Sequence, residues 1–134
     1  MILSKRIGQK VPVIYTTPEL SAVSKAWKFM FNTVLRRKLF YSFLPSASHV
    51  DARSYESPDE NFYSIIFKDE EDTRLLKYNI DSLKQSIKKG DQDVIEVSLT
   101  GKYFLLRLVS AYMMALSCIT YLGDQSQQSL REFA

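Results

Sequence analysis

Residues 16–44 read TTPELSAVSKAWKFMFNTVLRRKLFYSFL, and this stretch decides the fold that the sequence predicts. Thr17 suits the N-cap of a helix, Pro18 suits the first helical position, and Glu19 suits the positive end of the helix dipole. On a helical wheel one face is then apolar, formed by Leu20, Val23, Trp27, Met30, Phe31, Val34 and Tyr41. The pattern predicts a long amphipathic helix that ends before Pro45.

The helical phase slips near the end of this stretch. After residues 36–38, Leu39 and Phe43 fall on the polar side of the wheel. We therefore expect the helix to bend there or to be contacted from two directions.

A second informative stretch is residues 104–122, FLLRLVSAYMMALSCITYL, in which Arg107 is the only charge. Apolar residues occupy most of the helical wheel, so the pattern predicts a helix buried on nearly all sides. Gly123 is expected to stop this helix, and residues 125–134 are expected to form a polar tail. The stretch also approaches the length of a membrane span, which stays open as an alternative.

The middle of the chain alternates between loop, strand and helix signals. Residues 45–60 lack periodicity and predict a long surface loop. Runs at Phe62–Phe67 and Asp93–Leu99 are typical of strands, and Asp81–Lys89 is typical of a helix. Residues 69–80 fit either the second strand of a β-hairpin or the beginning of that helix, and the pattern does not choose between them.

Together with a short β-type run at Val11–Tyr15, these elements predict one α+β domain over residues 1–134. We expect a small, mainly antiparallel sheet, packed by a long N-terminal amphipathic helix and a buried C-terminal helix. A chain of this length buries enough surface to fold without disulfides or metals.

Cysteine and histidine are scarce. The apolar neighbours of Cys118, the only cysteine, predict a buried thiol in a reducing, cytoplasmic setting. His49, the only histidine, lies near Asp51 in the 45–60 loop without a nucleophile motif beside it. The sequence therefore predicts no catalytic site, no metal, no cofactor and no small-molecule substrate.

Charge is unevenly distributed along the chain. Residues 1–44 carry eight Lys or Arg and one Glu, whereas residues 51–96 carry seven basic and twelve acidic residues. A basic surface on the first helix would suit phosphate groups, which makes nucleic-acid binding an alternative function. The residues that would carry it are Lys25, Lys28, Arg36, Arg37 and Lys38.

The leading interpretation of the sequence is a small intracellular protein-binding or adaptor protein, alone or as a subunit of a larger assembly. Phe29, Leu39 and Phe43 lie off the main apolar face of the first helix and would form an exposed patch for a protein partner or a second copy. Nucleic-acid binding through the basic helix is one alternative. Membrane association through residues 104–122 is the other.

Overall fold

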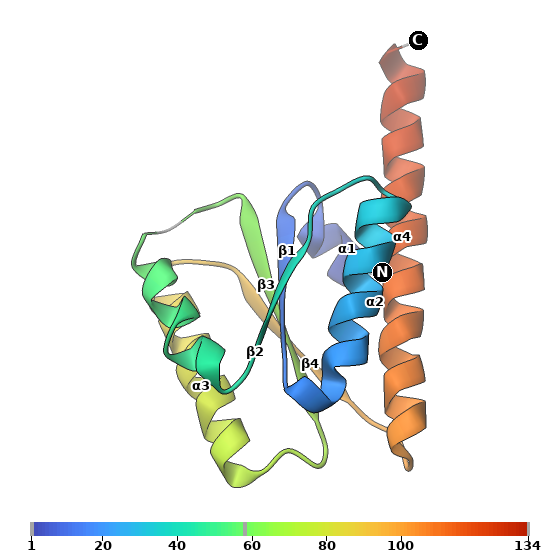
Figure 1. Ribbon diagram of the computed structural model, residues 1–134. Helices are drawn as coiled ribbons and strands as arrows, with labels where there is room; N and C mark the ends of the chain where they lie inside the picture. The colour runs from blue at the N-terminus through green and yellow to red at the C-terminus, as the bar shows by residue number, and fades with distance from the viewer. Residues whose placement is uncertain (1, 58, 134) are drawn as a thin grey trace.

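The computed structural model describes residues 2–57 and 59–133 and has an α/β architecture (Figure 1). A four-stranded sheet has the order β2-β1-β3-β4, and every neighbouring pair is parallel. The strands are β1 (Val11–Thr16), β2 (Phe40–Phe43), β3 (Phe62–Asp69) and β4 (Val94–Leu99). The expected antiparallel sheet is therefore wrong, because segments that cross a face of the sheet separate consecutive strands.

Helices cover both faces of the sheet (Figure 1). On one face lie α1 (Ile2–Ile7), α2 (Ser21–Thr33) and α4 (Phe104–Phe133). On the other face lies α3 (Arg74–Lys89), together with the 3-10 turns η2 (Ser46–Ser48) and η3 (Asp51–Glu56). A third short turn, η1 (Pro18–Leu20), leads into α2.

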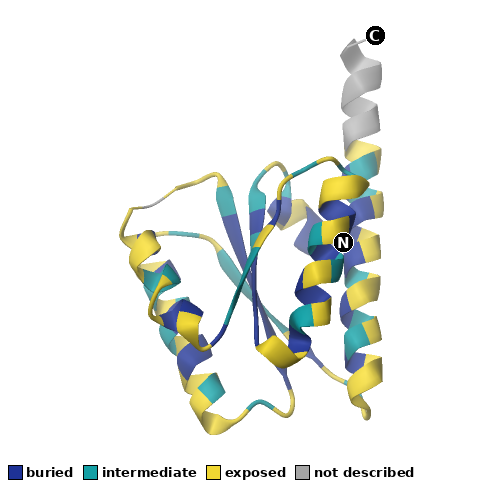
Figure 2. Ribbon diagram, viewed as in Figure 1, coloured by how far each residue is buried: buried dark blue, intermediate teal, exposed yellow. Residues whose placement is uncertain are grey.

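The central strand β3 explains why the sheet is parallel. Tyr63, Ile65 and Phe67 pack into the core on the α2 and α4 side, whereas Ile66 packs into the core on the α3 side. A strand covered on both faces needs a continuous apolar run instead of an alternating one. Residues 63–67 of β3 are all buried, and they are apolar except for Ser64 (Figure 2).

The long N-terminal helix is wrong in its length. Its N-terminal signals mark the turn η1 and not the α-helix, because Thr17 is the N-cap of η1 without a side-chain capping hydrogen bond and the N-cap of α2 is Leu20. The helix α2 ends at Thr33, Arg36 adopts a left-handed backbone with φ of 54°, and the chain continues into β2. The phase slip after residue 36 marks the end of the helix, not a bend in it.

Trp27 is the centre of the core between α2 and α4. Its side chain is fully buried, stacks on Phe31 and meets Phe67 of β3 at a ring-centroid distance of 5.6 Å. Its indole N–H donates to the carbonyl oxygen of Ala111 at 3.2 Å, which satisfies the polar atom of this buried ring.

The C-terminal helix differs from its prediction in burial and in length. Ala111, Ala115 and Cys118 of α4 face the core, but Leu105 is 68% exposed and Met113 is 55% exposed. Burial is thus one-sided (Figure 2). The helix also continues past Gly123 to Phe133, where a polar tail was expected. By length and composition, the segment Phe104–Gln125 could cross a membrane.

The structure also decides how residues 45–60 and 69–80 fold. Residues 74–89 form one helix whose N-cap is Thr73, with the hydroxyl oxygen accepting the N–H of Leu76 at 3.2 Å. The helix interpretation of residues 69–80 is therefore correct, and the hairpin is wrong. The expected loop at residues 45–60 contains η2 and η3, and Ala47 and Tyr55 from these turns enter the core beside α3.

Candidate functional site

The strand order creates a topological switch between β1 and β3. From β1 the chain passes to β2 on one side of the sheet, and β3 then lies on the other side of β1. The connections through α2 and α3 leave the sheet on opposite faces (Figure 1). In open α/β sheets this geometry leaves a crevice outside the carboxyl ends of the strands, where ligands bind. We use the term carboxyl edge for the residues that follow the carboxyl ends of β1, β3 and β4.

Hydroxyl groups form the β1 part of the carboxyl edge. Thr16 and Thr17 are both buried at the point where β1 ends. The hydroxyls of Thr16 and Ser24 form a hydrogen bond of 2.8 Å, which ties the end of the strand to the first turn of α2. Thr17 has an extended backbone, and its side chain makes no capping hydrogen bond.

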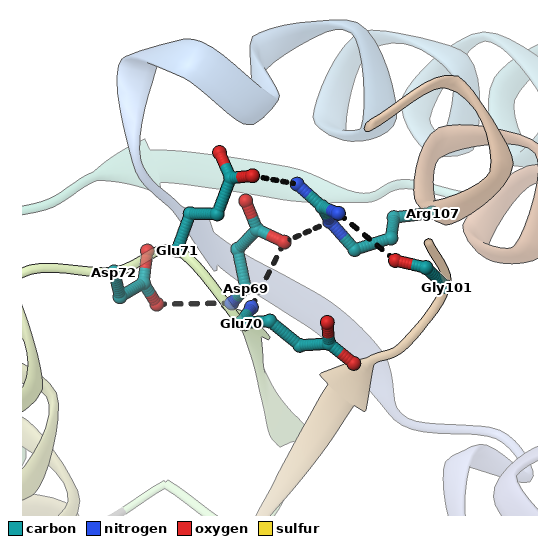
Figure 3. A network of polar contacts seen from close by, with 6 residues as sticks. All are labelled: Asp69, Glu70, Glu71, Asp72, Gly101 and Arg107. Atoms are coloured by element: carbon teal, nitrogen blue, oxygen red, sulfur yellow. Dashed lines mark hydrogen bonds and ion pairs between the residues drawn. The ribbon is translucent and has the colours of Figure 1, made fainter. Parts of the chain in front are cut away.

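A buried arginine forms the β3 part of the carboxyl edge (Figure 3). Arg107 of α4 is 1% exposed, and its Nε atom lies 2.5 Å from Oδ1 of Asp69. One terminal nitrogen lies 3.3 Å from Glu71, and the other donates to the carbonyl oxygen of Gly101 at 3.0 Å. A buried cation needs such partners, so this network joins α4 to the ends of β3 and β4.

Asp69 and Asp72 shape the turn that follows β3 (Figure 3). Asp69 accepts the N–H of Glu70 at 2.9 Å, and its own N–H donates to Asp72 at 2.9 Å. Burial raises the pKa of the Asp72 carboxyl and the charge of Asp69 adds to the rise, although the backbone hydrogen bond and two nearby lysines oppose it. Asp72 thus combines a hydrogen bond to the backbone of β3 with a carboxyl group whose pKa is raised.

A small cavity of about 180 Å³ adjoins this turn. It lies against the ends of β3 and β4, and Asp69 and Glu70 are among its lining residues. Lys68 and Lys77 also line it, and the ammonium group of Lys68 is 3.3 Å from Glu96 and is therefore already paired. Chemically, the turn offers carboxylate oxygens that accept hydrogen bonds. Its four acidic residues, 69–72, outnumber the nearby Lys77 and disfavour an anion.

The structure separates the three residues predicted to bind a protein partner. Phe29 on α2 is 66% exposed, whereas Leu39 is buried in the core. Phe43 is half-buried in β2, where its ring packs against Tyr41. The three side chains therefore do not form one exposed patch.

The five basic residues also do not form one helical stripe. Lys25 and Lys28 lie on α2, but residues 36–38 lie in the connection to β2. Lys28 lies over the ring of Tyr41. Arg37 donates to the carbonyl oxygen of Lys10 at 2.8 Å and lies over the ring of Phe31, and burial lowers its pKa. Two of these cations are thus engaged within the fold.

Sequence reasoning missed the Arg107 network. The pattern predicts a helix over residues 104–122 with Arg107 as its only charge, but it does not predict that the acids at residues 69–71 are its partners. One signal was available, because a single charge inside a long apolar helix that packs on a core requires a buried partner. His49, in contrast, is exposed at the end of η2 and has no described contact with the carboxyl edge.

Comparison with known proteins gives two matches. Residues 2–122 match the model of a family described as bacterial phospho-glucose isomerase C-terminal SIS domain. A bifunctional phosphoglucose/phosphomannose isomerase from Aquifex aeolicus (strain VF5) is 24% identical over 102 residues, which cover 75% of this chain and 31% of that relative. The chain thus matches about a third of the relative's length.

These matches overturn the functional interpretation of the sequence. Both are to isomerases or isomerase domains, not to adaptor, nucleic-acid-binding or membrane proteins. The expectations of a non-enzymatic protein and of no small-molecule substrate are therefore wrong. The sequence carries no short catalytic motif, whereas the evidence for a ligand site here lies in the strand order.

Proposed function

Because this chain belongs to the family of bacterial phosphoglucose isomerase C-terminal SIS domains, we propose that it is a hexose-phosphate-binding domain of a cytoplasmic sugar isomerase. The observation that carries the proposal is the switch between β1 and β3, which brings Thr17 and Asp72 to the same edge of the sheet. The name of the Aquifex relative supports phosphoglucose or phosphomannose as the ligand class.

The charges at the carboxyl edge favour one part of such a ligand. A sugar hydroxyl donates hydrogen bonds, and the turn at residues 69–72 supplies acceptor oxygens. A phosphate dianion would be repelled by the same carboxylates, and the guanidinium of Arg107 is already held by Asp69 and Glu71. We therefore propose that this domain contacts the sugar ring or chain and that the phosphate is held outside it.

Isomerisation of an aldose to a ketose moves a proton between neighbouring carbon atoms, so a group at the site must accept and return a proton. Asp72 is our candidate, because it is a carboxyl group at the carboxyl edge and burial raises its pKa. Since the match covers about a third of the Aquifex isomerase, we propose that further residues outside this chain complete the reaction.

Nuclear magnetic resonance of the isotope-labelled protein tests the ligand site. Glucose 6-phosphate, free glucose and inorganic phosphate are titrated separately. We expect glucose 6-phosphate and glucose to shift the amide signals of residues 16–20 and 69–73 at millimolar concentration, and inorganic phosphate to leave them unchanged. Shifts that avoid these residues, or a response to inorganic phosphate alone, would contradict the proposal.

Two matched variants test the role of Asp72. Asp72→Asn removes a carboxylate at the edge, whereas Asp81→Asn removes an exposed one on α3. We expect the first variant to weaken glucose 6-phosphate binding by about tenfold, which corresponds to one charge-assisted hydrogen bond, and the second to leave binding unchanged. Equal binding by both variants would remove Asp72 from the site.

A further inference from the structure

A larger cavity of about 410 Å³ lies away from the carboxyl edge. Phe40 and Phe62, which line it, are the first residues of β2 and β3, and Gln92 precedes β4. The cavity is therefore near the amino ends of the strands, between the sheet and η3. Its volume falls in the range of roughly 300–1,000 Å³ that is usual for small-molecule sites.

Three linked hydroxyl groups lie beside this cavity. The hydroxyls of Tyr15 and Tyr55, which line it, are 2.5 Å apart, and the hydroxyl of Tyr55 is 2.8 Å from that of Ser64. Both tyrosines are buried, and burial raises the pKa of each. The two hydrogen bonds use two of the three hydroxyl protons, and the tyrosine oxygens keep lone pairs that can accept from a ligand.

The charged groups that line the cavity are both acidic. Asp51 and Asp59 are lining residues, and no Lys, Arg or His lines the cavity among the described residues. Neither carboxylate takes part in the ion pairs found in the described part of the chain, and Oδ1 of the exposed Asp59 accepts hydrogen bonds from Asn61. Asp51 is half-buried and lies close enough to Tyr15 and Tyr55 for its charge to raise the pKa of both.

The remaining wall of the cavity is largely apolar. Val13, Phe40 and Phe62 supply an aliphatic side chain and two aromatic rings. Aromatic rings attract organic cations through their negative faces, and carboxylates do so through their charge. An anion, in contrast, would meet two carboxylates and no cation. The negative charge of the lining therefore disfavours hexose phosphates, the ligand class proposed for the carboxyl edge.

We propose that this cavity binds a small organic ammonium ion with an apolar or aromatic body. The charged nitrogen lies beside Asp51 and Asp59, and it donates to a tyrosine hydroxyl on the floor. The body of the ligand packs against Phe40 and Phe62. This site is separate from the carboxyl edge and does not rest on the function proposed for it.

The test uses three probes of similar shape and different charge. They are 2-phenylethylammonium, the neutral 2-phenylethanol and the anionic 3-phenylpropionate, each titrated into the isotope-labelled protein and followed by NMR. We expect the cation to shift the signals of residues 13–15 and 51–57 and to bind about tenfold more tightly than the alcohol. We expect no binding of the anion. Equal binding of the three probes would overturn the proposal.

Two variants make the test specific. Asp51→Asn is expected to weaken binding of the cation by about tenfold, whereas Asp124→Asn, an exposed change on α4, is expected to leave it unchanged. If Asp51→Asn does not fold, Asp59→Asn takes its place. Unchanged affinity in the folded variant would overturn the proposal, and the response to glucose 6-phosphate serves as an independent readout of the other site.

Discussion

Arg107 of α4 and Asp69 of β3 form a buried ion pair, with the Nε atom 2.5 Å from a carboxylate oxygen, between residues that lie far apart in the sequence. The pair joins the beginning of the C-terminal helix to the carboxyl end of a central strand (Figure 3). Replacing one partner leaves the other charge buried without compensation. The pair is therefore expected to affect stability more than any exposed ion pair.

We predict that Arg107→Leu lowers the free energy of unfolding by about 3–5 kcal/mol, because Asp69 loses its buried partner. Urea denaturation followed by circular dichroism measures the change. Glu71→Gln removes a partner that is 75% exposed and should cost less than about 1 kcal/mol. If the two variants have the same stability, the buried pair is not what holds α4 to the sheet.

A second prediction concerns Gly90 at the end of α3. Its φ is −82°, which any residue adopts, but a Cβ atom there would lie 2.1 Å from the carbonyl oxygen of Tyr55. Gly90→Ala should therefore destabilise the protein by about 1–3 kcal/mol through steric crowding. Thermal unfolding measures the effect.

Gly123 provides the matched control for Gly90. Its added Cβ would meet only Leu35, at an ordinary contact distance of 3.8 Å, and it lies inside α4. Gly123→Ala should leave stability unchanged or raise it by up to about 1 kcal/mol, because alanine favours helix. Similar losses in both variants would contradict the steric explanation.

A third prediction concerns alkaline pH. Burial, followed by the charge and hydrogen bond of Tyr55, raises the pKa of Tyr15 above the ordinary value of 10.0. The stability from this shift is fully present below pH 10.0 and is lost as pH rises further, since only the unfolded state then ionises. Above pH 10.0, Tyr15→Phe should reduce the loss of unfolding free energy by about 1.4 kcal/mol for each pH unit.

Urea unfolding over a series of alkaline pH values measures this slope. Tyr78→Phe is the control, because Tyr78 is 69% exposed. We expect the control to keep the slope of the unmodified protein. A slope that is the same for Tyr15→Phe and the unmodified protein would show that Tyr15 ionises equally in both states.

Local elements of the fold could be predicted from the sequence, but the pairing of strands could not. The strand runs near residues 11, 62 and 94 and the start of helical structure after Thr17 follow from local chemistry, and they are correct. Parallel and antiparallel pairing differ in which distant segments meet, and the hairpin interpretation assumed that neighbours in sequence pair. The run at residues 62–67, apolar except for Ser64, is the signal for a strand buried on both faces.

The candidate site was less predictable than the fold. Both the carboxyl edge and the larger cavity combine residues from distant segments, such as Asp69 with Arg107 and Tyr15 with Tyr55. No short motif connects such residues, because the sheet brings them together only after folding. Asp51 was noticed in the sequence as a neighbour of His49, whereas the structure places it beside two tyrosines in the cavity.

The all-parallel order of the sheet also governs how this chain reaches its native state. Val11 of β1 pairs with Phe62 of β3, so a long loop must close before the central pair of strands forms. No two-residue turn is available as a nucleus, because every strand pair requires a crossover. The chain should consequently fold more slowly than a helical bundle of equal length, and an emerging nascent chain leaves β1 with an open edge until residue 69 has been made.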